Sequence, residues 1–174
     1  MVERIDAYAG ALFEIAKVEG VLEQVEDELF RVARTIEGND QLRSALTDEA
    51  LPVDLRQGIV EDLIGGKASP VTTALVSFIV GIGRSRDLPA IIDRMVERAA
   101  TDRNEAVAEV RSAIPLDGEQ QRRLAEALGQ ATGKTLSLKV VVDPSILGGI
   151  VATIGDTVID GSVRHRLDQL KESL

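Results

Sequence analysis

The stretch that decides the fold of this chain covers residues 140–170, VVVDPSILGGIVATIGDTVIDGSVRHRLDQL. Its three consecutive valines at residues 140–142 are β-branched and predict a buried strand. Asp143-Pro144-Ser145 ends that strand, because proline has no N–H to donate to a β-ladder. Gly148-Gly149 then predicts a turn or a bulge at which a side chain would clash.

The second half of the stretch predicts a β-hairpin followed by a helix. Residues 150–154 form a second apolar run, and Gly155-Asp156 has the composition of a two-residue hairpin turn that returns the chain through residues 157–159. Asp160-Gly161-Ser162 closes the hairpin and offers Ser162 as the N-cap of a last helix. The stretch is therefore a closely specified hairpin that leads into a terminal amphipathic helix.

Upstream of this stretch the sequence is mostly helical. Apolar residues recur at helical spacing in six segments, at about residues 3–19, 21–36, 39–46, 53–64, 71–83 and 87–101. Near residues 102–104 the period changes from 3.6 to 2, which predicts a strand at 107–112, a helix at 118–131 and a strand at 136–142. We expect a mainly α protein with a six-helix bundle in residues 1–104. A smaller α/β domain in residues 105–174, with a short β-sheet and two helices, should follow it.

Composition excludes several classes of function. The chain has 174 residues, a net charge of −9, 2% aromatic residues and no cysteine. An acidic surface with few aromatic rings argues against nucleic-acid binding, and the lack of thiols excludes disulfides and zinc ribbons. The start of the chain predicts no secretory signal, and the low-charge run at 68–83 is too short and too polar to cross a bilayer. Membrane association is expected only through a partner.

The net charge is concentrated in the first third of the chain. Residues 1–62 hold 15 acidic and 6 basic side chains, whereas residues 63–174 hold 14 of each. The acidic excess is either a solvated face or a surface for an electropositive protein partner. The sequence leaves both interpretations open.

Side chains that could perform chemistry are few. The only histidine, His165, lies between two arginines with no nucleophile beside it and is interpreted as an exposed polar residue. Asp143, Asp156 and Asp160 are the one carboxylate group that could hold a cation, although each also suits a turn or a cap. The glycines match no phosphate-binding motif. An enzyme with a metal site at these aspartates is therefore one class of protein that the sequence leaves open.

Two helical segments are more apolar than packing on one side requires. The segment at 3–19 carries Ala7, Ala11 and Ile15 outside its main apolar stripe, and the segment at 71–83 is apolar nearly all round. Either both segments are interior, or they form a hydrophobic groove for an amphipathic helix from another protein.

Three stretches resemble one known family. Residues 8–16, YAGALFEIA, match the YAxALFxxA opening of the delta subunits of bacterial rotary ATP synthases, which are similar to the mitochondrial oligomycin-sensitivity-conferring protein. Phe78 and the Gly83-Arg84 turn follow the family in the middle of the chain, although its usual leucine after that arginine is displaced to Leu88. Residues 142–150, VDPSILGGI, together with residues 160–164 and Leu167, carry the most specific likeness.

The resemblance implies a non-catalytic stator subunit without cofactor, metal or nucleotide. In the family, the N-terminal six-helix bundle sits on the catalytic head, and its first and fifth helices grip the N-terminal helix of an alpha subunit. The C-terminal domain binds the b-type peripheral stalk, at the cytoplasmic face of the bacterial membrane. A free-standing helix-binding adaptor is the alternative. The residues expected to bind the alpha helix are Tyr8, Ala9, Leu12, Phe13, Leu75, Val76, Ile79 and Val80. The motif residues expected to be structural are Asp143, Pro144, Gly148, Gly149, Gly155, Asp160, Gly161 and Ser162.

Overall fold

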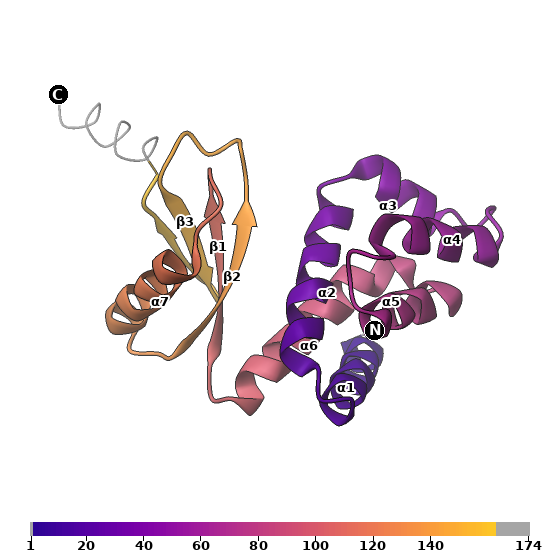
Figure 1. Ribbon diagram of the computed structural model, residues 1–174, viewed down its shortest axis with the longest axis horizontal. Coiled ribbons are helices and arrows are strands. Elements are labelled where there is room, and N and C mark those ends of the chain that lie inside the picture. Colours follow the sequence, from indigo (N-terminus) through magenta and orange to yellow (C-terminus); the bar gives the residue numbers. More distant parts are fainter. Residues whose placement is uncertain (1, 163–174) are drawn as a thin grey trace. The chain divides into compact units, whose positions relative to one another are not determined.

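The structure is a computed structural model that describes residues 2–162 (Figure 1). The chain divides into two compact units, Met1–Ala99 and Ala100–Leu174. Its described residues form seven α-helices and one four-stranded sheet, so the fold is mainly helical with a small sheet in the C-terminal part. The predicted terminal helix after Ser162 lies outside the described residues.

Six of the helices lie almost entirely within the first unit. They are α1 (Val2–Val18), α2 (Leu22–Glu37), α3 (Asp40–Thr47), α4 (Val53–Ile64), α5 (Pro70–Gly81) and α6 (Leu88–Asp102), with a 3₁₀ turn at Ser85–Asp87. Local sequence explains where two of them begin. The Asn39 side chain accepts a hydrogen bond from the Leu42 N–H at 3.0 Å and caps α3. Ser69 caps α5 in the same way, with proline at the first helical position.

Helix α6 contributes a continuous apolar face to the interior of the first unit. Its residues Leu88, Ile91, Ile92, Met95 and Val96 are almost fully buried. These side chains recur at the spacing of a single helical face, which is the face that the sequence predicts for this segment.

Two side-chain orientations differ from the helical pattern. Helical spacing predicts that Glu26 lies on the outer face of α2, opposite the apolar stripe, but the structure buries it fully. Helix α2 contacts α1, α3 and α5, so a wider arc of its surface is covered than one apolar stripe indicates. On α4 the same spacing predicts that Leu55 faces the interior, but Leu55 is 59% exposed. The buried positions are Arg56, Val60 and Ile64.

A buried carboxylate joins α2 to the start of α5. Glu28 accepts hydrogen bonds from the Thr72 hydroxyl at 2.6 Å, from the Ser69 N–H at 2.9 Å and from the Gln24 amide at 2.9 Å. Burial opposes ionisation of Glu28, but these hydrogen bonds outweigh it and lower the pKa from 4.5 to about 2. The connection spans more than 40 residues of sequence and fixes the turn between α4 and α5 against α2.

The described part of the second unit is a four-stranded sheet with one helix packed on it. Its elements are β1 (Ala106–Ser112), α7 (Gly118–Thr132), β2 (Leu136–Val142), β3 (Ile150–Ile154) and β4 (Thr157–Asp160), and the strand order is β2-β1-β3-β4. Strands β1 and β2 are parallel, joined through α7, and β3 pairs antiparallel with both β1 and β4. Helix α7 begins with a capping box between Asp117 and Gln120 and ends at Gly133, which is left-handed.

The core of this unit lies between α7 and one face of the sheet. Parallel register places Val110 opposite Val140, and antiparallel register places it opposite Ala152, so the three side chains share one face. The buried members of this core are Ala108, Val110, Leu128, Leu136, Ala152 and Ile154.

Candidate functional site

Helix α1 presents an apolar strip to solvent. Ala7, Ala11, Ile15 and Val18, which we call the α1 strip, recur at three- and four-residue spacing and so share one side of the helix. Ile15 is 44% exposed and Val18 is 82% exposed. The opposite side of α1, which carries Leu12, is buried in the unit's interior.

Helix α5 presents a second apolar strip. Ala74 and Phe78 on α5 and Ile82 at its C-cap, which we call the α5 strip, follow one another every four residues and are all exposed. Phe78 is 50% exposed, whereas the other two phenylalanines of the chain, Phe13 and Phe30, are buried. Aromatic side chains are enriched among residues that anchor protein interfaces. A half-exposed phenylalanine in so aromatic-poor a chain therefore marks α5 as a candidate binding surface.

The residues predicted to line the groove lie mostly inside the unit. Ala9, Leu12 and Phe13 on α1 are at most 3% exposed, and Tyr8 is half-buried. Phe13 packs beneath two cations, with the Lys17 ammonium 5.0 Å and the Arg98 guanidinium carbon 5.5 Å from its ring centre. On α5 the other predicted residues, which are Leu75, Val76, Ile79 and Val80, are also buried.

Those seven buried side chains already fill the interior of the unit, so in this conformation an incoming helix would meet the α1 and α5 strips instead. The sequence did contain a signal for these strips. Ala7, Ala11 and Ile15 stand outside the main stripe of the first helix, and Phe78 and Ile82 belong to a helix that is apolar nearly all round.

The motif residues of the second unit form turns. Asp143 accepts hydrogen bonds from the Ser145 hydroxyl at 2.6 Å and from the Ser145 N–H at 2.9 Å, and these bonds, aided by Arg111, lower the pKa of its carboxyl. Pro144 is exposed within the same turn. Gly155 has φ +57° in the hairpin turn between β3 and β4.

A close backbone approach explains the glycines that precede β3. Gly148 and Gly149 have φ of +107° and +80°, and a Cβ on Gly149 would lie 2.5 Å from the carbonyl oxygen of Gly161. The Gly161 N–H donates to the Ile150 carbonyl at 2.9 Å, and the Ser162 N–H donates to the Asp160 carboxylate at 2.8 Å. Ser162 itself is buried. The stretch is thus closed on itself by backbone contacts.

The three aspartates do not converge on a metal site. Within residues 2–162, no group of three or more histidine, cysteine or carboxylate residues is arranged to hold a metal ion. Asp143 and Asp160 accept backbone N–H groups in turns, and Asp156 is exposed in the hairpin turn. His165 lies outside the described residues. None of the helices described is both long and apolar enough to cross a membrane.

The chain matches one known protein family over nearly its whole length. The family model of the ATP synthase delta (OSCP) subunit matches residues 5–174. The chain belongs to this family. The resemblance found in the sequence is therefore confirmed, and it extends over both units of this delta (OSCP) family member.

Curated relatives carry the same family description. The chain is 44% identical over 164 residues to the ATP synthase subunit delta of Nocardia farcinica, a match that covers 94% of this chain and 61% of the relative. It is 40% identical over 155 residues to the subunit delta of Streptomyces avermitilis, covering 89% and 57%. This delta (OSCP) chain thus spans about three-fifths of the length of the curated relatives that it matches.

A solved structure shares the fold of this delta (OSCP) family member. A chain in the cryo-EM structure of the Toxoplasma gondii mitochondrial ATP synthase hexamer is similar with a TM-score of 0.58 and 25% sequence identity. The match covers 97% of this chain and 96% of that chain. The likeness therefore includes the helical part and the sheet.

Proposed function

We propose that the chain is a non-catalytic stator subunit of a proton-translocating rotary ATP synthase. It links the catalytic head to a membrane-anchored b-type stalk, so that the head does not turn with the central rotor. The observation that carries this proposal is the family match over residues 5–174. The subunit itself needs no cofactor and no nucleotide, and it reaches the cytoplasmic face of the membrane only through its partner subunits.

The two parts of the chain divide this work. Residues 1–104 act as a six-helix bundle that binds the N-terminal helix of an alpha subunit, and residues 105–174 bind the peripheral stalk. Support for the first assignment comes from the α1 and α5 strips, which expose Ile15, Val18, Phe78 and Ile82. An amphipathic helix would cover such strips with its own apolar face.

The strips alone would give only a weak contact. Burying the exposed portions of these four side chains contributes about 5 kcal/mol in total, at 1.5–3 kcal/mol for each fully buried side chain. Association costs about 4–15 kcal/mol in lost translational and rotational freedom. A stator that holds under torque therefore depends on simultaneous contacts with several subunits, which slow dissociation by avidity.

Co-purification tests the proposal. The affinity-tagged chain, expressed in its own cell and recovered from detergent-solubilised membranes, should carry with it a complex that hydrolyses ATP. Mass spectrometry should find alpha and b-type subunits in that complex. Recovery of the chain with partners unrelated to any ATP synthase would instead support the alternative, a free-standing adaptor that binds helices through the same two strips.

A further inference from the structure

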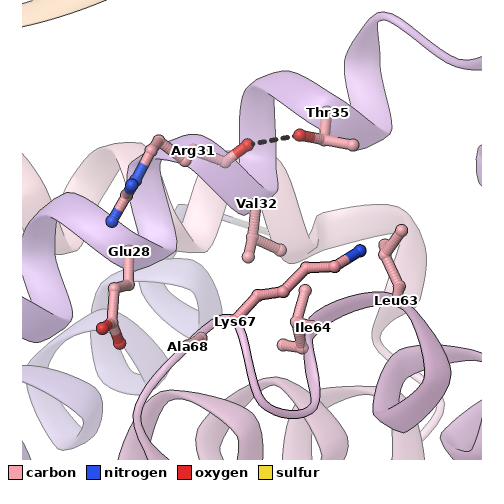
Figure 2. A pocket seen from close by; sticks show the side chains of 8 residues that line it. All are labelled: Glu28, Arg31, Val32, Thr35, Leu63, Ile64, Lys67 and Ala68. Atoms are coloured by element: carbon pink, nitrogen blue, oxygen red, sulfur yellow. Dashed lines mark hydrogen bonds between the residues drawn. The ribbon is translucent and has the colours of Figure 1, made fainter.

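A cavity opens on the first unit away from the α1 and α5 strips. Its volume is about 260 Å³, and its walls come from α2, from the end of α4 and from the turn that follows α4. Val32, Leu63 and Ile64 make an apolar floor (Figure 2). In the view of Figure 2 the Lys67 side chain runs between Val32 and Ile64, with its ammonium group at the Leu63 end.

Two cations border the cavity without a carboxylate partner. Arg31 and Lys67 both line it, and neither forms an ion pair with another residue of the described part of the chain. The Arg31 Nε donates only to the Asp27 carbonyl, at 3.3 Å. Neither charge is therefore neutralised by a direct ion pair among the described residues. The two cations give the cavity the charge pattern of an anion site.

The wall that carries Lys67 is held in place by backbone hydrogen bonds. The Lys67 and Ala68 N–H groups donate to the Ile64 carbonyl at 3.0 and 2.9 Å, and the Ser69 N–H donates to Glu28 at 2.9 Å. Thr72 adds a hydroxyl hydrogen bond to the same carboxylate at 2.6 Å. The cavity is therefore preformed, and a ligand would lose little free energy in ordering it.

Glu28 also sets the direction in which an anion would lie. Its carboxylate is turned toward Ala68 and is occupied by Thr72, Ser69 and Gln24, so it does not neutralise Lys67 (Figure 2). A ligand carboxylate would avoid this negative end and approach the Lys67 ammonium at the opposite end. An alkyl chain attached to it would then cover the apolar floor.

We propose that this cavity binds a small amphiphilic carboxylate of the fatty-acid type. The carboxylate pairs with Lys67, Arg31 adds a second positive charge at the rim, and the alkyl chain lies on Val32, Leu63 and Ile64. A concave site with an apolar lining and a few polar groups is the usual form of a small-molecule site. This inference does not depend on the stator function, because it involves neither strip.

Octanoate is the probe for the test. In a ¹H–¹⁵N NMR titration of the whole chain, octanoate should shift the amides of Thr35, Lys67 and Ala68, and calorimetry should give its Kd. Lys67→Met should raise that Kd at least about fivefold. The matched control Lys134→Met, which removes an exposed cation from the second unit, should leave it unchanged. Ala68→Phe should fill the cavity and abolish binding while both cations remain.

Ligand controls separate charge from apolar contact. Octanol, with the same chain length and no charge, should bind the unmodified chain more weakly than octanoate and should be insensitive to Lys67→Met. The proposal is overturned if octanoate shifts no amide of the cavity, if the two lysine variants bind it equally, or if octylammonium binds as well. Binding of an acidic leucine-containing peptide or of phosphatidylglycerol vesicles through Lys67, without octanoate binding, would overturn it as well.

Discussion

The buried carboxylate of Glu28 offers a quantitative test of how the first unit is held together. Glu28→Gln keeps the shape of the side chain but replaces one carboxylate oxygen with an NH₂ group. Ser69 and Thr72 donate to one carboxylate oxygen at 2.9 and 2.6 Å and Gln24 donates to the other at 2.9 Å, so the NH₂ group would face a donor in either orientation of the amide. Because donors cannot bond to each other, at least one buried hydrogen bond is lost.

The pKa of Glu28 gives the expected magnitude. Its value is lowered from 4.5 to about 2, and each pKa unit corresponds to about 1.4 kcal/mol of differential stabilisation. The full shift would correspond to about 3 kcal/mol, and since glutamine retains one acceptor, we expect Glu28→Gln to lower the free energy of unfolding by about 2 kcal/mol at pH 7.

The pH dependence has a definite sign. The folded pKa lies below the unfolded pKa, so the stabilisation is complete above about pH 5 and is lost as the pH falls from 4.5 toward 2. More than half of it should be lost by about pH 3. The difference in unfolding free energy between the unmodified chain and Glu28→Gln should therefore shrink by a similar fraction between pH 7 and pH 3.

Urea denaturation at the two pH values measures this difference, because titration of the other carboxylates is common to both proteins. Glu23→Gln is the matched control, since Glu23 is exposed on the same helix, and its effect should be below about 0.5 kcal/mol. The reasoning is refuted if Glu28→Gln destabilises the chain no more than Glu23→Gln at pH 7. It is also refuted if the difference is the same at both pH values.

Three further predictions concern the binding surface and the second unit. Phe78→Asp should weaken binding of an alpha N-terminal peptide at least about tenfold in calorimetry, with an unchanged thermal midpoint. The control Leu55→Asp, at an exposed site on α4, should leave the affinity unchanged, and equal affinities of the two variants would remove the α5 strip from the interface. Gly149→Ala should destabilise the second unit by at least about 2 kcal/mol, because φ is +80° and the new Cβ meets the Gly161 carbonyl. The control Gly118→Ala, with open space around it, should be near neutral, and comparable unfolding midpoints of the two variants would contradict this explanation. Magnesium, calcium and manganese should leave the thermal midpoint unchanged, and a rise of several degrees with any of them would revive a metal site at the aspartates.

Local patterns predicted much of the fold. The helix predicted at 118–131, the Gly155-Asp156 hairpin turn and the apolar face of α6 all follow from residues close together in sequence, and all are present in the structure. Such features depend on backbone geometry and helical period, which a single sequence displays directly. The specific family motif at residues 142–164 predicted the family in the same way.

Features that depend on distant residues could not be predicted. Helical spacing placed Leu12 on the apolar stripe of the first helix and Val76 in a segment that is apolar nearly all round, but it could not decide whether either side chain faces the interior or a partner. The structure buries both, and the exposed strips carry Ile15 and Phe78 instead. The hydrogen bond between Glu28 and Thr72 could not be predicted either, because Thr72 lies 44 residues further along the chain.

The most direct test of the stator function is mechanical coupling in membrane vesicles that contain the ATP synthase. Without a stator the head turns with the rotor, so ATP hydrolysis continues but moves no protons. Depleting this subunit should therefore preserve ATP hydrolysis and abolish ATP-driven acidification of the vesicles, and restoring it should recover acidification. Vesicles that acidify equally well without the subunit would contradict the proposed function.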